Sequence, residues 1–320
     1  MRALLFVAII GTIAGCYRES SSDKPIVTNA SDPALLANDA SCRGGDDLDH
    51  PVDDVFPEGR LRTHSTGPLS NAGNRAWQGL KLPESIPLAI GTRELFLADS
   101  TDEGFFLLYR DPYGTSSCTL GGKTNCAYDA ALYTVEGKHE WTLSLGAVMS
   151  RPDGLEVQDI RYARGVLYFN EACQSYSSEQ GGRCSSLVAV DPRAKKVLWR
   201  TPSLVSNGRF VVRGCYIVAG YGFTSEPDNV FLVDRSTGAI AQKFAVSSAP
   251  QIYKVGKERL DITLYSGTTR RYRLEGIESH SGRIVELDKP EAMYGGAGYG
   301  GAGYGGYTYG GAQYGGVRRP

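Results

Sequence analysis

The sequence has 320 residues, enough for one large or two medium domains with a sizeable buried core. Lysine plus arginine number 34 and aspartate plus glutamate 35, so the chain lacks the basic excess of a nucleic-acid-binding protein. Only one long apolar stretch is present, near the N-terminus, which excludes a protein with several transmembrane helices.

That stretch has the features of a secretory leader. After a positively charged start, residues 3–13 form an apolar run that is too short to span a bilayer. The ending Ile13-Ala14-Gly15-Cys16 resembles the lipobox of bacterial lipoproteins, in which the cysteine is lipidated and becomes the first residue after cleavage. The resemblance implies a signal peptide over residues 1–15 and a lipid anchor on Cys16. A plain signal peptide with an unrelated cysteine is the alternative.

The residue after the lipidated cysteine indicates to which membrane the protein is sorted. Tyr17 stands there rather than aspartate, and by the sorting rule of enteric lipoproteins this favours the outer membrane. Several acyl chains on Cys16 would anchor the protein stably. We therefore expect a lipid-anchored protein of the bacterial cell envelope, at the outer membrane.

Residues 16–60 are polar and rich in Ser, Asp and Ala, which predicts a disordered tether behind the lipidated cysteine. The acidic residues between Asp46 and Asp54 lack the ordered spacing and the closing glutamate of an EF-hand loop. A solvated acidic linker is therefore favoured over a calcium site.

From about residue 84, short runs rich in Val, Ile, Leu, Tyr and Phe alternate with Gly, Asp, Asn and Ser, a pattern typical of strands and turns. Four segments can be aligned. The first apolar run of each segment covers residues 95–97, 166–169, 216–219 and 260–264. The second run covers residues 132–135, 187–191, 230–234 and 271–274.

A period near 40 to 45 residues with four strands per unit is the signature of a propeller blade. We predict an all-β fold over residues 61–290, a β-propeller of four-stranded antiparallel blades with four to five blade-like repeats. Residues 61–83 could supply a closing strand, and we expect a ring closed by joining N- and C-terminal strands. In the last segment, Tyr272 and Leu274 should point inward and Arg271 and Arg273 outward. A two-sheet sandwich is the alternative.

Two of the segments carry a more specific pattern. Residues 187–199 contain a strand that ends at Asp191 and a following strand that ends at Trp199, and residues 230–240 contain Asp234 and Thr237-Gly238. This pattern resembles the repeat of quinoprotein-type (PQQ-like) propellers. The likeness covers residues 84–288 and is specific in these two units, and the units that end at Trp141 and Val285 are degenerate.

Apart from Cys16, the chain has six cysteines, an even number that predicts disulfides in a secreted protein. Two pairs each bracket a polar loop and can staple the end of a hairpin: Cys118 with Cys126, and Cys173 with Cys184. The remaining pair, Cys42 and Cys215, would tie the N-terminal segment to the body. A metal site is the alternative, disfavoured because no CxxC occurs and the histidines are scattered at His50, His64, His139 and His280.

Catalytic quinoproteins have a calcium site and often a vicinal disulfide beside the quinone. This chain has neither an adjacent cysteine pair nor an evident Glu, Asn and Asp cluster, and it lacks the G-x-S-x-G and H-E-x-x-H motifs. We therefore expect no enzyme activity, no catalytic or metal-binding residues and no cofactor. The alternative is a ligand-binding or enzymatic propeller that takes a quinone, a sugar or a metal in its central channel.

The resemblance also includes non-catalytic lipoproteins, and it implies a scaffold that binds other envelope proteins through its loops. The two stapled loops, 118–126 and 173–184, come from equivalent positions in neighbouring blades. They should therefore lie side by side on one rim, which we expect to be the contact surface. The tail, residues 291–320, is rich in Gly and Tyr with almost no aliphatic side chains, and we expect it to be disordered.

Overall fold

The computed structural model describes residues 42, 76–77, 80–112, 126–223 and 225–287. Within them the regular elements are β-strands and two short 3₁₀ turns, η2 (Leu145–Ala147) and η3 (Ser177–Gln180). No helix among these residues is long and apolar enough to cross a membrane. The predicted leader with Cys16, the tether apart from Cys42, and the Gly/Tyr tail lie outside the described residues.

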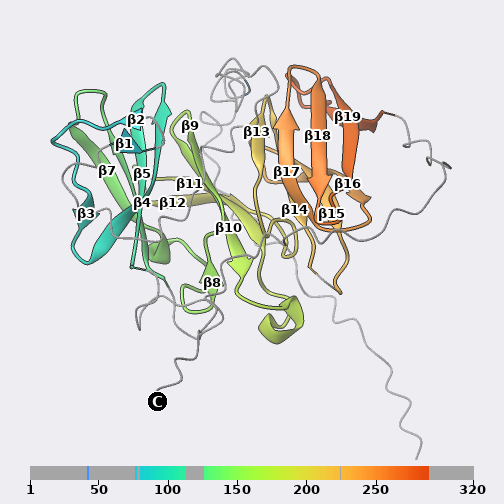
Figure 1. The fold of residues 1–320 in the computed structure, drawn as a ribbon, viewed down its shortest axis with the longest axis horizontal. Helices are drawn as coiled ribbons and strands as arrows, with labels where there is room; N and C mark the ends of the chain where they lie inside the picture. The colour runs from blue at the N-terminus through green and yellow to red at the C-terminus, as the bar shows by residue number, and fades with distance from the viewer. Residues whose placement is uncertain (1–41, 43–75, 78–79, 113–125, 224, 288–320) are drawn as a thin grey trace, which may run out of the picture. The chain divides into compact units, whose positions relative to one another are not determined.

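Four antiparallel sheets follow one another along the chain, and we number them blades 1 to 4 (Figure 1). Blade 1 contains β3 (Ala89–Ile90), β4 (Arg93–Thr101), β5 (Gly104–Arg110), β6 (Tyr128–Tyr133) and β7 (His139–Ser144). Blade 2 contains β8 (Leu155–Glu156), β9 (Ile160–Ala163), β10 (Val166–Cys173), β11 (Ser186–Asp191) and β12 (Lys196–Arg200). Blade 3 contains β13 (Val211–Arg213), β14 (Tyr216–Tyr221), β15 (Asn229–Asp234) and β16 (Ile240–Ala245). Blade 4 contains β17 (Pro250–Val255), β18 (Arg259–Leu264), β19 (Thr269–Glu275) and β20 (Arg283–Glu286). A separate pair joins β1 (Ala76–Trp77) to β2 (Leu80–Lys81).

Blades 1, 3 and 4 are meanders in which strands that are consecutive in sequence pair side by side. In blade 2, both β9 and β8 pair with β10, along different parts of its length. The predicted all-β fold, a β-propeller of four-stranded antiparallel blades, is confirmed, with four blades in the described residues. The third strands β11 and β15 are buried along almost their whole length, which explains why they are continuous apolar runs rather than alternating ones.

The repeat is visible in the strand register. The pairing of the third and fourth strands shifts in three blades, between Leu132 and Tyr133, between Ala189 and Val190, and between Leu232 and Val233. The residues paired just before each shift are Trp141, Trp199 and Gln242. The predicted equivalence of Trp141 and Trp199 is therefore correct. In blade 3, Gln242 takes this position and connects to blade 4, because its amide donates to the carbonyl of Ile284 at 2.9 Å and accepts from its N–H at 2.8 Å.

The alignment of the first segment was wrong by one strand. Residues 95–97 lie in β4, which precedes the strand that corresponds to β10, β14 and β18. The corresponding strand is β5, because it pairs with β6 as β10 pairs with β11. Both β4 and β5 are long and apolar, so hydrophobic pattern alone did not distinguish them.

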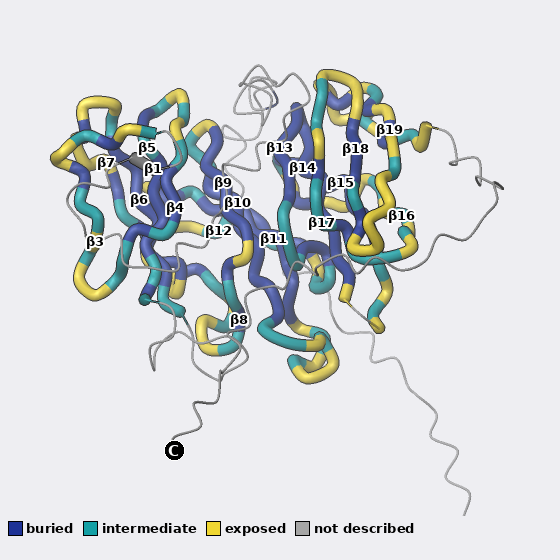
Figure 2. The backbone as a smooth tube through the Cα atoms, viewed as in Figure 1, coloured by how far each residue is buried: buried dark blue, intermediate teal, exposed yellow. Residues whose placement is uncertain are grey.

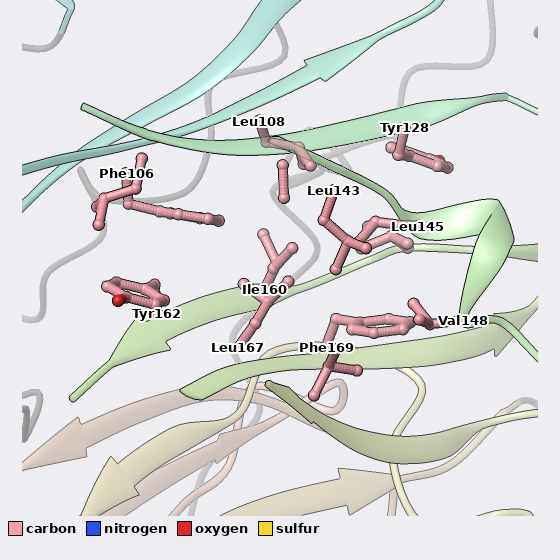
Figure 3. Close-up of a cluster of buried hydrophobic side chains, with 14 of the residues drawn as sticks. Phe106, Leu108, Tyr128, Leu143, Leu145, Val148, Ile160, Tyr162, Leu167 and Phe169 are labelled. Atoms are coloured by element: carbon pink, nitrogen blue, oxygen red, sulfur yellow. The ribbon is translucent and has the colours of Figure 1, made fainter. Parts of the chain in front are cut away.

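Consecutive blades share hydrophobic cores. Phe106 and Leu108 of blade 1 lie in one cluster with Ile160 and Phe169 of blade 2, shown in Figure 3. A second cluster joins blades 2 and 3, and a third joins blades 3 and 4. Each blade thus buries a face that it could not bury alone.

The expected closure of the ring is not present in the described residues. The other face of blade 1 is covered by its own preceding segment, which includes Leu82 and Ile86, and no cluster joins blade 1 to blade 4. The strand β1 pairs with β2 and not with a C-terminal strand. In β19, Tyr272 is buried and Arg271 is exposed, so the predicted inward and outward faces are confirmed there.

Candidate functional site

The last four strands of each blade form an antiparallel meander, so the connections between the second and third of these four strands all lie at the same end of the strands. We define the rim as these connections, residues 111–127, 174–185, 222–228 and 265–268. The structure describes the second and fourth of these connections completely, and the third apart from residue 224. In Figure 2, exposed residues gather in the turns at both ends of the strands, whereas strands such as β10, β11 and β14 are mostly buried.

The rim loop of blade 2 is held at both ends. Cys173, the last residue of β10, forms a disulfide with Cys184, as predicted. Inside the loop, the 3₁₀ turn η3 is followed by Gly181 and Gly182, whose N–H groups donate to the carbonyls of Ser178 and Ser177 at 3.1 and 2.7 Å. Both glycines have positive φ, which an L-residue adopts at a cost. The loop therefore has a defined local conformation.

The corresponding loop of blade 1 is only partly described. Cys126 is disulfide-bonded. Cys118 and the other residues from 113 to 125 lie outside the described residues, so the expected proximity of the two stapled loops stays a prediction.

A carboxylate joins the loop of blade 2 to that of blade 3. Glu226 accepts hydrogen bonds from the N–H and hydroxyl of Ser177 at 2.7 and 2.6 Å, and from the hydroxyl of Tyr221. Burial alone would raise the pKa of Glu226, but these hydrogen bonds outweigh it, and the pKa is lowered. Burial, and then the bond to Glu226, raise the pKa of the Tyr221 phenol. Glu226 is thus a charged clamp between two neighbouring blades.

The same two loops carry an exposed aromatic pair. The rings of Tyr176 and Phe223 meet edge to face with centroids 4.8 Å apart, and they remain 38% and 43% exposed. On the rim turn of blade 4, Tyr265 is 66% exposed. These three are the strongly exposed aromatic side chains of the described residues, and all three belong to the rim.

The rim loops of blades 3 and 4 also approach one another. A Cβ at Gly222 would lie 2.7 Å from the Cα of Ala249, so only glycine fits there without displacement. The carbonyl of Ala249 in turn accepts the N–H of Tyr265 at 2.8 Å. Aromatic side chains are typical of protein interfaces, where they bury a large area at a small cost in side-chain entropy.

Buried carboxylates elsewhere are occupied by structural contacts. Glu171 is 1% exposed and accepts from the N–H and hydroxyl of Ser150 and from two nitrogens of Arg200 at 2.6 to 3.0 Å. Asp159 accepts from the N–H of Phe210 and pairs with Arg161, each at 2.9 Å. These groups fix the contacts between segments, and their acceptor positions are filled by protein donors.

A hollow of about 460 Å³ lies beside blade 4. Its lining includes Arg213, which pairs with Glu278 at 2.5 Å and donates to the carbonyl of Lys257 at 3.1 Å. Small-molecule sites are usually apolar with a few polar groups, whereas charged side chains predominate here.

The other predicted residues have clear positions. Cys42 and Cys215 form a disulfide, so the predicted pairing is present. His139 is exposed and contacts the hydroxyl of Thr142 at 2.8 Å. His280 is also exposed, and its Nε2 lies 3.7 Å from the sulfur of Cys42.

Sequence reasoning missed Tyr176, Phe223, Tyr265 and Glu226. The available signal was an aromatic residue within each polar rim loop, at Tyr176 between two cysteines, at Phe223 before Thr224-Ser225, and at Tyr265 before Ser266-Gly267. No such signal existed for Glu226, because its partner lies 49 residues away.

No protein-family model matches the chain, and no curated protein sequence is similar to it. Among solved structures, it is similar to the computationally designed Ika4 protein, with a TM-score of 0.37 and 8% identity over 59% of this chain and 97% of that one. It is also similar to BamB from Moraxella catarrhalis, with a TM-score of 0.33 and 11% identity over 63% of this chain. A quinohemoprotein alcohol dehydrogenase from Comamonas testosteroni matches with a TM-score of 0.25 and 14% identity over 38% of this chain.

The matches span 62% of the BamB chain and 19% of the dehydrogenase chain. At these TM-scores and identities, the likenesses describe a shared kind of sheet repeat and carry no functional information.

Proposed function

We propose that the protein is a non-catalytic lipoprotein, anchored through Cys16, whose β-propeller blades form a scaffold for protein–protein interaction at the bacterial envelope. The observation that carries this proposal is the exposed aromatic pair Tyr176 and Phe223, held on two loops that Glu226 and the Cys173–Cys184 disulfide fix in place. Exposed aromatics on preordered loops lose little conformational entropy when a partner covers them. The partners would be other envelope proteins, and the membrane would be the outer membrane.

Site-specific crosslinking tests the rim as the contact surface. A photoreactive residue placed at Ser178, which is exposed on η3, should give a discrete protein adduct in intact envelopes. The double substitution Tyr176→Ser and Phe223→Ser should remove that adduct. The same probe at Val135 is the matched control, because Val135 is 62% exposed in the turn between β6 and β7, at the opposite end of the strands.

Two results would contradict the proposal. One is an identical adduct pattern from the probes at Ser178 and Val135, and the other is an adduct that survives loss of both aromatic side chains. The anchor is tested separately, because mass spectrometry of the mature N-terminus should find a lipid-modified Cys16. Turnover of a bound quinone or sugar by the purified protein would contradict the non-catalytic role.

A further inference from the structure

Three side chains that can bind a metal, from separate parts of the chain, meet where blades 3 and 4 adjoin. Cys42 is disulfide-bonded to Cys215, which lies in the turn between β13 and β14. His280, from the turn between β19 and β20, places its Nε2 3.7 Å from the sulfur of Cys42. Both sulfurs and a ring nitrogen of His280 lie within 4.8 Å of one another.

The imidazole is oriented by a carboxylate. Asp234, at the end of β15, accepts from His280 Nδ1 at 2.6 Å, which leaves Nε2 facing the sulfur. Asp234 is itself fixed, because its other oxygen accepts from the N–H groups of Ser236 and Thr237 at 3.0 and 2.9 Å. A carboxylate behind a histidine is the usual support for a metal-binding imidazole.

The cysteine on blade 3 is also fixed in position. Cys215 is fully buried, donates its N–H to the carbonyl of Ile277 at 2.8 Å, and accepts the N–H of Arg235 at 2.8 Å. Cys42 is 2% exposed, whereas the His280 side chain is 45% exposed. The cluster therefore opens to solvent on the histidine side.

Two thiolates and one neutral imidazole are donors that zinc(II) prefers in proteins, and a tetrahedral site holds its sulfurs about 3.8 Å apart. We propose that opening the Cys42–Cys215 disulfide converts this cluster into a zinc site with Cys42, Cys215 and His280 as ligands and a fourth position open to water. The disulfide and the metal are then two alternative links between the N-terminal segment and the body of the protein.

Reduction of the Cys42–Cys215 disulfide requires a two-electron reductant, such as a dithiol or a phosphine. The reductant gives two electrons, the S–S bond breaks, and two thiols form as two protons are taken up. Zinc then displaces both thiol protons on binding. In the reverse direction, a disulfide oxidant takes up two electrons, the S–S bond re-forms, and zinc is released.

The chain contains a matched control in its other described disulfide. Cys173 and Cys184 pack in a small cluster with Leu155 and Met149, and the neighbouring polar group is the hydroxyl of Ser185, 3.1 Å from the Cys173 sulfur. Among the described residues, no histidine or carboxylate joins this pair as a third ligand. Reduction should therefore create a zinc site at one pair of cysteines and not at the other.

The test uses the full chain reduced with a phosphine, with zinc chloride as the probe. Alkylation followed by mass spectrometry should show that one equivalent of zinc protects Cys42 and Cys215 and leaves Cys173 and Cys184 reactive. Competition with a colorimetric zinc chelator should show a loss of affinity of at least about tenfold in His280→Gln, and of about 10- to 100-fold in Asp234→Asn.

Selective protection also reports on folding, because Cys42 and Cys215 are 173 residues apart and an unfolded chain would not hold them together. The proposal is overturned if zinc protects both pairs equally or neither pair. It is also overturned if His280→Gln binds zinc as tightly as the unmodified sequence, or if the double variant Cys42→Ser and Cys215→Ser does.

Discussion

Gly238 turns the chain directly against the indole of Trp199 in the preceding blade. Its φ is +73°, and a Cβ there would lie 2.6 Å from the ring. We expect Gly238→Ala to lower the free energy of unfolding by about 2–3 kcal/mol, since it adds both backbone strain and a steric clash. Equilibrium urea unfolding measures the change.

The preceding blade offers the matched control. Lys195 occupies the same place after Asp191 that Gly238 occupies after Asp234, and its φ is +55°. We expect Lys195→Gly to be neutral or stabilising by up to about 1 kcal/mol, because glycine adopts this conformation without strain. If Lys195→Gly destabilised the protein as much as Gly238→Ala, then side-chain contacts at this turn, and not the backbone conformation, would determine how much the turn contributes to stability.

For single residues, the sequence predicts contacts between near neighbours in the chain but not contacts between distant ones. The Cys173–Cys184 disulfide was predictable because its cysteines are only 11 positions apart in the sequence and enclose a polar loop. The turn at Asp234 was predictable because its side chain bonds to the next few N–H groups. The contact of His280 with Cys42 spans 238 residues and has no local signal, since it depends on how two blades and the N-terminal segment meet.

Strand elements were predicted better than their order within a blade. The third and fourth strands of blades 2 and 3 could be located because an aspartate followed by a turn ends the third strand in both, at Asp191 and Asp234. Blade 1 lacks that motif and has an extra strand, β3, so its first run was assigned to β4 instead of β5. Alternating hydrophobicity identifies a strand but not its rank in a meander.

The docking of one rim loop on the next depends on the charge of Glu226. Because its folded pKa is lowered below the ordinary 4.5, its stabilising effect is complete above that pH and is lost as pH falls through the folded value. We expect Glu226→Gln to cost about 1 kcal/mol at pH 7, since the group is partly exposed, and the difference should be smaller at pH 3 than at pH 7. Urea unfolding at both pH values measures it.

Glu179 provides the control for that measurement, because it is exposed on η3 in the same loop. Glu179→Gln should leave the free energy of unfolding within about 0.5 kcal/mol at either pH. If Glu226→Gln kept its full effect at pH 3, the loss would come from packing at the clamp and not from the carboxylate charge.

The residue patterns of the four blades differ according to whether one or both faces of the sheet are covered. In blades 2 and 3, both faces are packed, and β11 and β15 are accordingly apolar at successive positions. In blade 4, β19 alternates between buried and charged residues, which is the pattern of a sheet with one face in water. The sequence therefore contained the information that this blade is covered on one side, although the repeat suggested a closed ring.

The outer face of blade 4 makes this argument testable. Arg271 and Tyr272 are adjacent in β19 but point to opposite faces, one exposed and the other 2% exposed. We expect Tyr272→Ala to lower the free energy of unfolding by about 3–5 kcal/mol, because it leaves a cavity in the core between blades 3 and 4. Arg271→Ala should change it by less than about 0.5 kcal/mol, because its side chain lies in solvent. A large loss from Arg271→Ala in urea unfolding would mean that another part of the chain, or a second copy, covers this face and completes the stack of blades.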